Sequence, residues 1–203
     1  MRIISPKESR IGDVIEALKH GATLVYPTET CYGLGCDATN VAAVEKMYAI
    51  KGRPEGKSLI VIVASLEMMA PYIEVTPTLR QIEKKYWPGA MTVVVESIVN
   101  SGELARGVVS IDGTVAFRVT SHPFARALVT AFGRPLVSTS ANLSGEQNLY
   151  SAIEVEKTFQ NREYQPDVLI DAGVLPITLP STVIRVAGTE IEILRQGEII
   201  PNI

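Results

Sequence analysis

Apolar side chains recur along this chain with two different periods, and each period predicts a different kind of element. Where they return every three or four residues, as at Ile11, Val14, Ile15 and Leu18, the spacing is that of an amphipathic helix. A polar capping residue, or a proline suited to the first turn, marks the start of the other segments of this kind. The predicted helices begin at Ile11, after Asn40, after Thr76, at Pro123 and after Ser151.

Continuous apolar runs lie between these helices and predict strands. The run LIVIVA at residues 59–64 is typical of a strand that is covered on both faces. Two late strands, joined through Ala187, Gly188 and Thr189, are expected to form a hairpin. The polar, glycine-bearing segment 100–113 is expected to be an exposed excursion. The predicted strands cover residues 2–4, 22–26, 59–64, 91–95, 115–119, 136–139, 168–171, 181–186 and 190–194.

The order of these elements predicts the fold class. Strands and helices alternate early and strands cluster late, which favours an α/β fold with a twisted mixed sheet flanked by helices. The late hairpin argues against an all-parallel sheet. No internal repeat, low-complexity tract or linker interrupts the 203 residues, so we expect a single domain over residues 1–203.

Composition narrows the class of protein. The chain is 46% hydrophobic and 20% charged, a globular profile that excludes disorder as the dominant state. No apolar run approaches the roughly 18 residues that a membrane span needs, and no secretory signal is visible. Cys31 and Cys36 are too few for a disulfide framework or a four-ligand zinc site, so a cytoplasmic protein is expected. A net charge of −3 argues against binding nucleic acid by bulk charge, although a local basic patch would be compatible with it.

The first candidate site follows the predicted strand 22–26. The sequence YPTETCYGLG at residues 26–35 places Thr28, Thr30 and two glycines beyond the carboxyl end of a buried strand, where α/β sheets bind ligands. The hydroxyls can donate hydrogen bonds, and the glycines let a ligand approach the backbone. An ordinary strand-to-helix turn explains the composition equally well. The spacing matches neither a Rossmann GxGxxG nor a P-loop.

The second candidate is a group of three cations after the helix that Asn40 begins. Lys51, Arg53 and Lys57 share a glycine-containing segment that suits a polyphosphate, because arginine forks onto phosphate oxygens and lysine supplies a point charge. A solvated basic loop is the alternative. The functional interpretation gains support because the segment leads directly into the buried strand 59–64.

The third candidate, STSANLSG at residues 138–145, carries four hydroxyls and an amide after a short apolar strand. Such groups can bind neutral polar edges or phosphate oxygens, and they can equally satisfy their own turn. A serine nucleophile is not favoured, because the chain has no GxSxG elbow. Its two histidines, His20 and His122, are explained by a helix end and a helix start.

Two arginines stand in apolar strand segments. Arg118 lies within VAFRV, and Arg195 follows the last predicted strand. A buried arginine needs a partner, which is either a protein carboxylate or an anionic ligand such as an amino-acid carboxylate. No cluster of metal-ligand residues accompanies them, so no metal held by the protein is predicted. A metal, if used, would be Mg²⁺ that arrives with a nucleotide.

Five motifs, taken in order, resemble the YrdC-type threonylcarbamoyl-AMP synthase family. They are YPTETCYGLG, KGRP, YWPGAMT, FRVTSHP and PLVSTSANLSG, and the resemblance extends from about residue 10 to about residue 197. The chain is similar to the short, single-domain bacterial form. It departs from some longer relatives, which carry a histidine in the strand after the basic loop, where residues 59–64 have none. A threonine contact of that kind is therefore not carried over.

The resemblance implies a YrdC-like fold and an L-threonylcarbamoyladenylate synthase, a nucleotidyltransferase. Such an enzyme combines L-threonine, bicarbonate and ATP, with Mg²⁺ accompanying the ATP, and releases pyrophosphate. The implied partner is a threonylcarbamoyl transferase complex that modifies the adenosine beside the tRNA anticodon. The resemblance implies that the catalytic residues are Lys51, Arg53, Ser140 and Asn142. The residues that it implies for ATP are Arg53, Lys57, Thr114, Ser140, Asn148 and Arg195, and those for threonine are Thr30, Arg118, Ser138 and Ser181.

Two other functions are compatible with the sequence. An RNA- or tRNA-binding module of the same fold would use the basic loop without catalysis, although the net charge of −3 opposes it. A paralogue would keep the ATP site and act on another carbamoyl-type substrate, because substrate choice depends on the shape of the pocket. The intact segments YPTET and STSAN favour the synthase over this paralogue.

Overall fold

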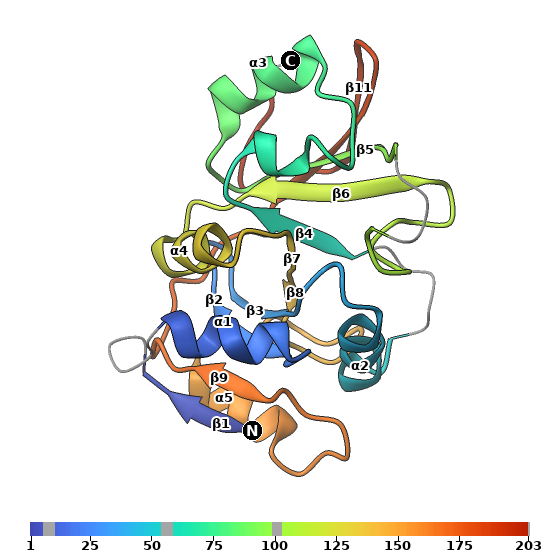
Figure 1. Cartoon of the computed structure of the whole chain (residues 1–203). Helices are drawn as coiled ribbons and strands as arrows, with labels where there is room; N and C mark the ends of the chain where they lie inside the picture. The colour runs from blue at the N-terminus through green and yellow to red at the C-terminus, as the bar shows by residue number, and fades with distance from the viewer. Residues whose placement is uncertain (6–10, 54–58, 99–102, 203) are drawn as a thin grey trace.

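The computed structural model describes residues 1–5, 11–53, 59–98 and 103–202 (Figure 1). Helices begin where the capping residues predict them. The Asn40 side chain accepts a hydrogen bond from the Ala43 amide, and Ser151 and Glu154 form a capping box. The helices are α1 (Ile11–Lys19), α2 (Val41–Lys51), α3 (Pro77–Tyr86), α4 (Pro123–Phe132) and α5 (Ala152–Phe159), with a 3-10 helix η1 (Leu66–Met69).

The strands form two mixed sheets, ordered β1-β9-β2-β3-β8 and β11-β10-β5-β6-β4-β7. The first contains β1 (Arg2–Ile4), β9 (Val168–Ile170), β2 (Leu24–Pro27), β3 (Tyr32–Gly35) and β8 (Thr139–Ser140). The second contains β11 (Glu190–Arg195), β10 (Thr182–Ala187), β5 (Met91–Glu96), β6 (Thr114–Val119), β4 (Ile60–Val63) and β7 (Leu136–Val137). The predicted α/β class with mixed pairing is confirmed, and the strands are shared between two sheets rather than gathered in one.

The segment 136–139, predicted as one strand, is divided between the two sheets. β7 pairs with β4 in the six-stranded sheet, and β8 pairs with β3 in the five-stranded sheet. Ser138 lies at the crossing point, where its amide donates a 2.8 Å hydrogen bond to the Ile60 carbonyl. The hydroxyl-rich segment is therefore placed at the junction of the sheets.

The sequence prediction missed β3, which pairs with β2 as an antiparallel hairpin. Two glycines, Gly33 and Gly35, make this strand hard to recognise, because glycine is disfavoured in strands. A close backbone approach explains Gly35, since a Cβ there would lie 2.2 Å from the Val137 carbonyl oxygen. The segment 26–35 is thus a hairpin whose turn projects between the sheets.

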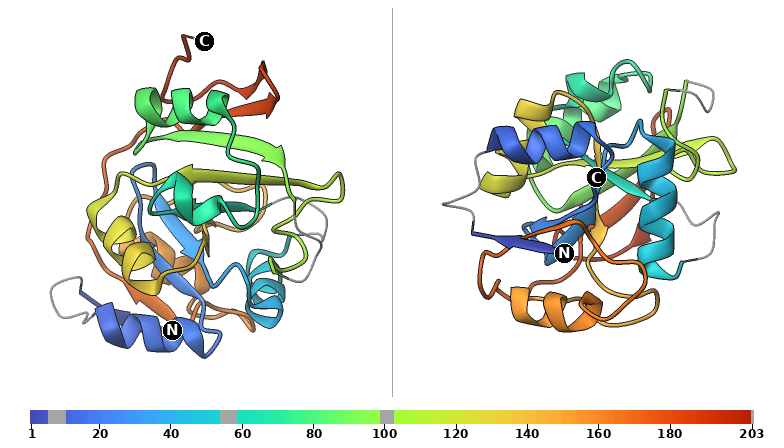
Figure 2. Two further views of the ribbon diagram at one scale, coloured as in Figure 1. Left: turned by 45° about the horizontal axis from the view of Figure 1, so that its top comes forward. Right: turned by 60° about the horizontal axis from the view of Figure 1, so that its bottom comes forward.

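The two sheets share a core. One cluster of buried apolar side chains includes Leu34 of β3 and Val93 of β5, so strands of both sheets contribute to it. A second cluster, with Leu18, Leu24 and Leu128, lies where α1 and α4 pack together beside β2 and β4. Both views of Figure 2 place α1 and α4 on one side of the molecule and α2 on another. Within the described residues, no helix is long and apolar enough to cross a membrane.

The segment before β6, predicted to be an exposed excursion, is exposed only in part, since residues 111–113 are exposed and others are buried. In its described part, Leu104, Ala105 and Val108 are only 1%, 2% and 0% exposed. The Ala105 amide donates to the Ala38 carbonyl, so the segment packs against the chain that precedes α2. Its buried residues have no regular spacing, and the composition alone therefore gave no sign of their burial.

Candidate active site

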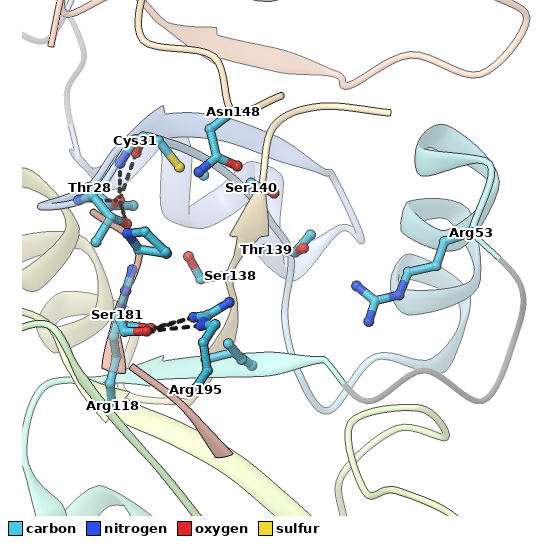
Figure 3. Close-up of a pocket in the computed structure, with 14 residues that line it drawn as sticks. Thr28, Cys31, Arg53, Arg118, Ser138, Thr139, Ser140, Asn148, Ser181 and Arg195 are labelled. Carbon is cyan, nitrogen blue, oxygen red and sulfur yellow. Dashed lines mark hydrogen bonds between the residues drawn. The ribbon is translucent and has the colours of Figure 1, made fainter. Parts of the chain in front are cut away.

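A cavity of about 260 Å³ lies at the junction of the two sheets (Figure 3). The turn after β2 and strands β3 and β8 line it from the five-stranded sheet, and β4, β6 and β11 line it from the six-stranded sheet. Hydroxyl groups and arginines dominate, and no carboxylate stands among the described lining residues. These are Thr28, Thr30, Cys31, Gly33, Arg53, Ile60, Arg118, Ser138, Thr139, Ser140, Asn148, Pro180, Ser181 and Arg195.

Three guanidinium groups converge on the cavity from different elements. Arg53 follows α2, Arg118 belongs to β6, and Arg195 ends β11. Figure 3 shows Arg53 reaching in from one side and the other two from the opposite side, with Ser138 and Thr139 on the strand segment between them. Guanidinium groups in a site without a lining carboxylate attract anions, and their planar forks suit phosphate and carboxylate oxygens. The cavity is therefore built to bind a polyanion.

Arg195 is held in place by the residue before β10. Its Nε and Nη2 donate hydrogen bonds of 3.1 and 2.8 Å to the Ser181 carbonyl, and Nη2 also lies 3.1 Å from the Ser181 hydroxyl. The Ser181 hydroxyl in turn contacts that of Thr92 at 2.9 Å. Burial, together with the nearby charge of Arg118, lowers the pKa of Arg195. An anion bound beside the two arginines would oppose this lowering, because its charge stabilises the charged guanidinium.

Arg118 is a strand arginine whose side chain is only 7% exposed. Its Nε lies 3.2 Å from Oε1 of Glu29, which identifies a protein carboxylate as one partner. The contact is an ion pair and not a hydrogen bond, and neither atom has a hydrogen-bond partner among the described residues. Arg118 also lines the cavity, so an anionic ligand there can reach its guanidinium group.

Lys51 and Asn142 build the wall of the cavity and do not line it. The Lys51 ammonium donates to the carbonyls of Ser140 and Asn142 at 2.5 and 2.9 Å, and to Oδ1 of Asn142 at 3.1 Å. The Ser140 hydroxyl donates to the same Oδ1 at 2.5 Å, and Nδ2 of Asn142 donates to the Glu146 carbonyl at 2.6 Å. Burial lowers the pKa of Lys51 to about 8. This network connects the end of α2, and hence Arg53, to the loop that carries Ser140.

The hairpin turn is held by Thr28. Its hydroxyl donates to the Cys31 carbonyl at 2.7 Å and accepts from the amides of Thr30 and Cys31. Gly33 lies behind it, where a Cβ would come within 2.9 Å of the Thr28 methyl and 3.1 Å of the Ser138 hydroxyl. The glycine therefore keeps this wall thin, as expected for a backbone that a ligand approaches closely.

The structure brings most of the predicted site residues together. Eight of them line the cavity, namely Thr30, Arg53, Arg118, Ser138, Ser140, Asn148, Ser181 and Arg195. Lys51 and Asn142 lie immediately behind its wall. Thr114 does not line it, because its hydroxyl donates to Asp112 at the exposed start of β6. Lys57 lies outside the described residues.

The sequence did not point to Glu29 or to the cavity positions Ile60 and Pro180. Glu29 stands between two threonines, a context that predicts a solvent-exposed carboxylate. Its burial is explained only by its ion pair with Arg118, which is distant in the sequence. The two histidines lie where predicted. His20 follows α1 with its Nδ1 2.7 Å from the Glu16 carbonyl, and His122 precedes α4.

Within the described residues, no group of three or more His, Cys, Asp or Glu side chains could hold a metal ion. Cys31 and Cys36 are free and buried. The cavity offers hydroxyl, amide and guanidinium groups, which are poor Mg²⁺ ligands compared with carboxylates. These residues do not fit a magnesium site held by the protein alone.

Comparison with known proteins identifies the family. The family model Sua5_yciO_yrdC, described as "Telomere recombination", matches residues 16–197. The chain belongs to the Sua5/YciO/YrdC family. A Psychromonas ingrahamii protein named threonylcarbamoyl-AMP synthase is 37% identical over 180 residues, which are 87% of this chain and 92% of the relative. The resemblance inferred from the five motifs is confirmed.

Solved structures of this family share the fold. P. abyssi Sua5 complexed with L-threonine superposes with a TM-score of 0.85 at 30% identity. The match covers 97% of this chain and 57% of the Sua5 chain, so this chain spans a little over half of that protein. E. coli YciO superposes with a TM-score of 0.81 at 28% identity, covering 97% of this chain and 94% of YciO. The YrdC-like fold is confirmed.

Proposed function

We propose that this Sua5/YciO/YrdC-family protein is an L-threonylcarbamoyladenylate synthase, a nucleotidyltransferase that acts as a single domain. It forms threonylcarbamoyl-AMP and pyrophosphate from L-threonine, bicarbonate and ATP. The named relative and the threonine complex of Sua5 support the reaction. The observation that carries the proposal is the convergence of Arg53, Arg118 and Arg195 on one hydroxyl-lined cavity.

The reaction needs positioned substrates and positive charge from the protein, and it needs no nucleophilic side chain. The threonine amine attacks the carbon of bicarbonate and water leaves, which gives a carbamate. A carbamate oxygen then attacks the α-phosphorus of ATP, and the bond to the β-phosphate oxygen breaks, so that pyrophosphate departs. Both steps are accelerated by holding the reactants together and by cations that meet developing negative charge. The cavity supplies such groups.

The three arginines bind different substrates. Arg118, deep in the cavity, binds the threonine carboxylate together with hydroxyls from both sheets. Arg53 and Arg195 meet the triphosphate. Lys51 and Asn142, assigned to catalysis by resemblance, act by holding the loop that carries Ser140. The other expected contacts are Thr30, Ser138 and Ser181 for threonine, and Ser140 and Asn148 for ATP.

The assignments of Lys57 and Thr114 to ATP rest on the family resemblance alone. Mg²⁺ would accompany the triphosphate, held by phosphate oxygens and water, because the described cavity residues offer it no carboxylate. We expect the product to pass, in the cytoplasm, to a transferase complex that modifies the adenosine beside the tRNA anticodon.

The experiment is pyrophosphate release from ATP, Mg²⁺ and bicarbonate at low salt, with and without L-threonine. L-Serine and glycine serve as amino-acid controls. Release that requires both L-threonine and bicarbonate is the expected result. ATP binding without threonine-dependent release would instead indicate a paralogue with another acceptor. Loss of RNA affinity with rising salt, without ATP binding, would indicate an RNA-binding module.

A further inference from the structure

We propose that Glu29 is a positioning residue, which holds Arg118 in the orientation that binds the carboxylate of the amino-acid substrate. Its role toward threonine rests on the proposed function, whereas its contact with Arg118 does not. Glu29 lies in the turn between β2 and β3 and is absent from the cavity lining. It therefore acts through Arg118 and has no direct contact with substrate.

The first observation is the bridge that Glu29 makes between two residues of one chain segment. Its Oε1 lies 3.2 Å from Arg118 Nε, and its Oε2 accepts a 2.7 Å hydrogen bond from the Thr120 hydroxyl. Arg118 and Thr120 are two residues apart, so their side chains point to the same face of an extended segment. One carboxylate thus engages both and fixes the guanidinium relative to the backbone of β6.

The second observation is burial. The side chains of Arg118 and Glu29 are 7% and 12% exposed, and Thr120 is fully buried. A guanidinium in such surroundings requires a counter-charge, and removal of one partner of a buried pair leaves the other uncompensated. Glu29 supplies this charge from behind the cavity, so the cavity-facing side of Arg118 stays available for a ligand.

The third observation is that Glu29 connects the two sheets across the site. Its turn belongs to the five-stranded sheet, whereas Arg118 belongs to the six-stranded sheet. The same turn carries Thr30, whose carbonyl accepts a 2.9 Å hydrogen bond from the Thr178 hydroxyl. The Glu29 carboxylate therefore sets the position of Arg118 relative to Thr30, the two expected threonine contacts.

The test uses Glu29→Gln, which keeps the size of the side chain, and Thr120→Val, which removes only the hydroxyl that holds the carboxylate. Thr120→Ser retains that hydroxyl, so its KM for L-threonine should be that of the wild type. Glu163→Gln in an exposed loop and Thr158→Val on α5 are matched controls. Kinetics of pyrophosphate release give separate KM values for L-threonine and ATP. We expect the threonine KM to rise about tenfold in Glu29→Gln and about fivefold in Thr120→Val, while the ATP KM changes by less than about twofold.

A second readout does not depend on activity. The Nε–H resonance of Arg118 in a ¹⁵N NMR spectrum, assigned by its loss in Arg118→Lys, should be sharp in the wild type and in Thr120→Ser. It should broaden or shift in Glu29→Gln and Thr120→Val. A wild type that releases no threonine-dependent pyrophosphate would overturn the proposed function, and the NMR comparison would still decide whether Glu29 holds Arg118. Unchanged resonances, or an unchanged threonine KM in an active enzyme, would overturn the positioning role.

Discussion

Replacement of Lys51 by methionine separates a role in positioning from a role in stability. The ammonium group is buried and donates three hydrogen bonds to oxygens of Ser140 and Asn142. Methionine has a similar length and an apolar body, so it fills the space but donates nothing. The backbone bond from the Ser144 amide to the Lys51 carbonyl remains in the variant. The loop should stay attached, with Ser140 less well placed.

The magnitudes come from the same contacts. Burial lowers the pKa of Lys51 from 10.5 to about 8, which corresponds to about 3 kcal/mol against the charged form. Methionine avoids this cost, but it leaves three buried oxygens without the lysine donor, at about 1–3 kcal/mol for each. We expect Lys51→Met to lower the free energy of unfolding by only about 2 kcal/mol. A displacement of Ser140 by about 1 Å should lower kcat/KM about 100-fold.

The assay pairs urea denaturation with pyrophosphate release, and Lys84→Met on the exposed face of α3 is the control. The control should change neither the free energy of unfolding nor kcat/KM. Full activity in Lys51→Met would refute the positioning argument. A loss of stability of about 5 kcal/mol or more would also refute it, because Lys51 would then be chiefly a structural residue.

Three further predictions follow from the same structure. Between pH about 8 and 10.5, Lys51 binds more protons in the unfolded chain than in the folded chain, so its contribution to stability should rise with pH. The unfolding free energy of the wild type minus that of Lys51→Met should increase by up to about 3 kcal/mol over this range. A difference that does not change with pH would contradict the lowered pKa. Arg53→Ala should lower kcat/KM by a factor equivalent to about 2–4 kcal/mol, and retention of full turnover would remove Arg53 from the site. Gly35→Ala, whose Cβ would lie 2.2 Å from the Val137 carbonyl oxygen, should destabilise the protein by about 3 kcal/mol in urea denaturation. Gly12→Ala in open space on α1 should be neutral or stabilising in the same measurement, and equal effects of the two would contradict the packing argument.

The helix starts show what local sequence can predict. The starts of α2 and α5 were predicted from Asn40 and from Ser151 with Glu154, and the structure confirms both caps. The partners in a cap are three residues apart, so the information lies within one turn of chain. The buried strand at residues 60–63 was equally visible, because a continuous apolar run has few other uses.

The arrangement of the strands in the sheets could not be predicted from local sequence. The segment 136–139 gives no sign that it is divided between two sheets at Ser138, because each half is only about two residues long and carries no alternation that would assign it to a sheet. The glycines of β3 hid a strand whose stability comes from pairing with β2 and β8. Such pairing depends on neighbours that lie far away in the sequence.

The candidate site was likewise predictable from the sequence only in part. The sequence by itself determined which residues are candidates for the chemistry: arginines in apolar strands, a hydroxyl-rich turn and the cations at and after the end of α2, each a local pattern of residue types. Only the tertiary structure decided that Arg53, Arg118 and Arg195 share one cavity, that Lys51 supports its wall, and that Glu29 pairs with Arg118. The physical reason is distance along the chain. The partners of Lys51 and Glu29 lie about 90 residues away, and sheet pairing rather than any local preference brings them into contact.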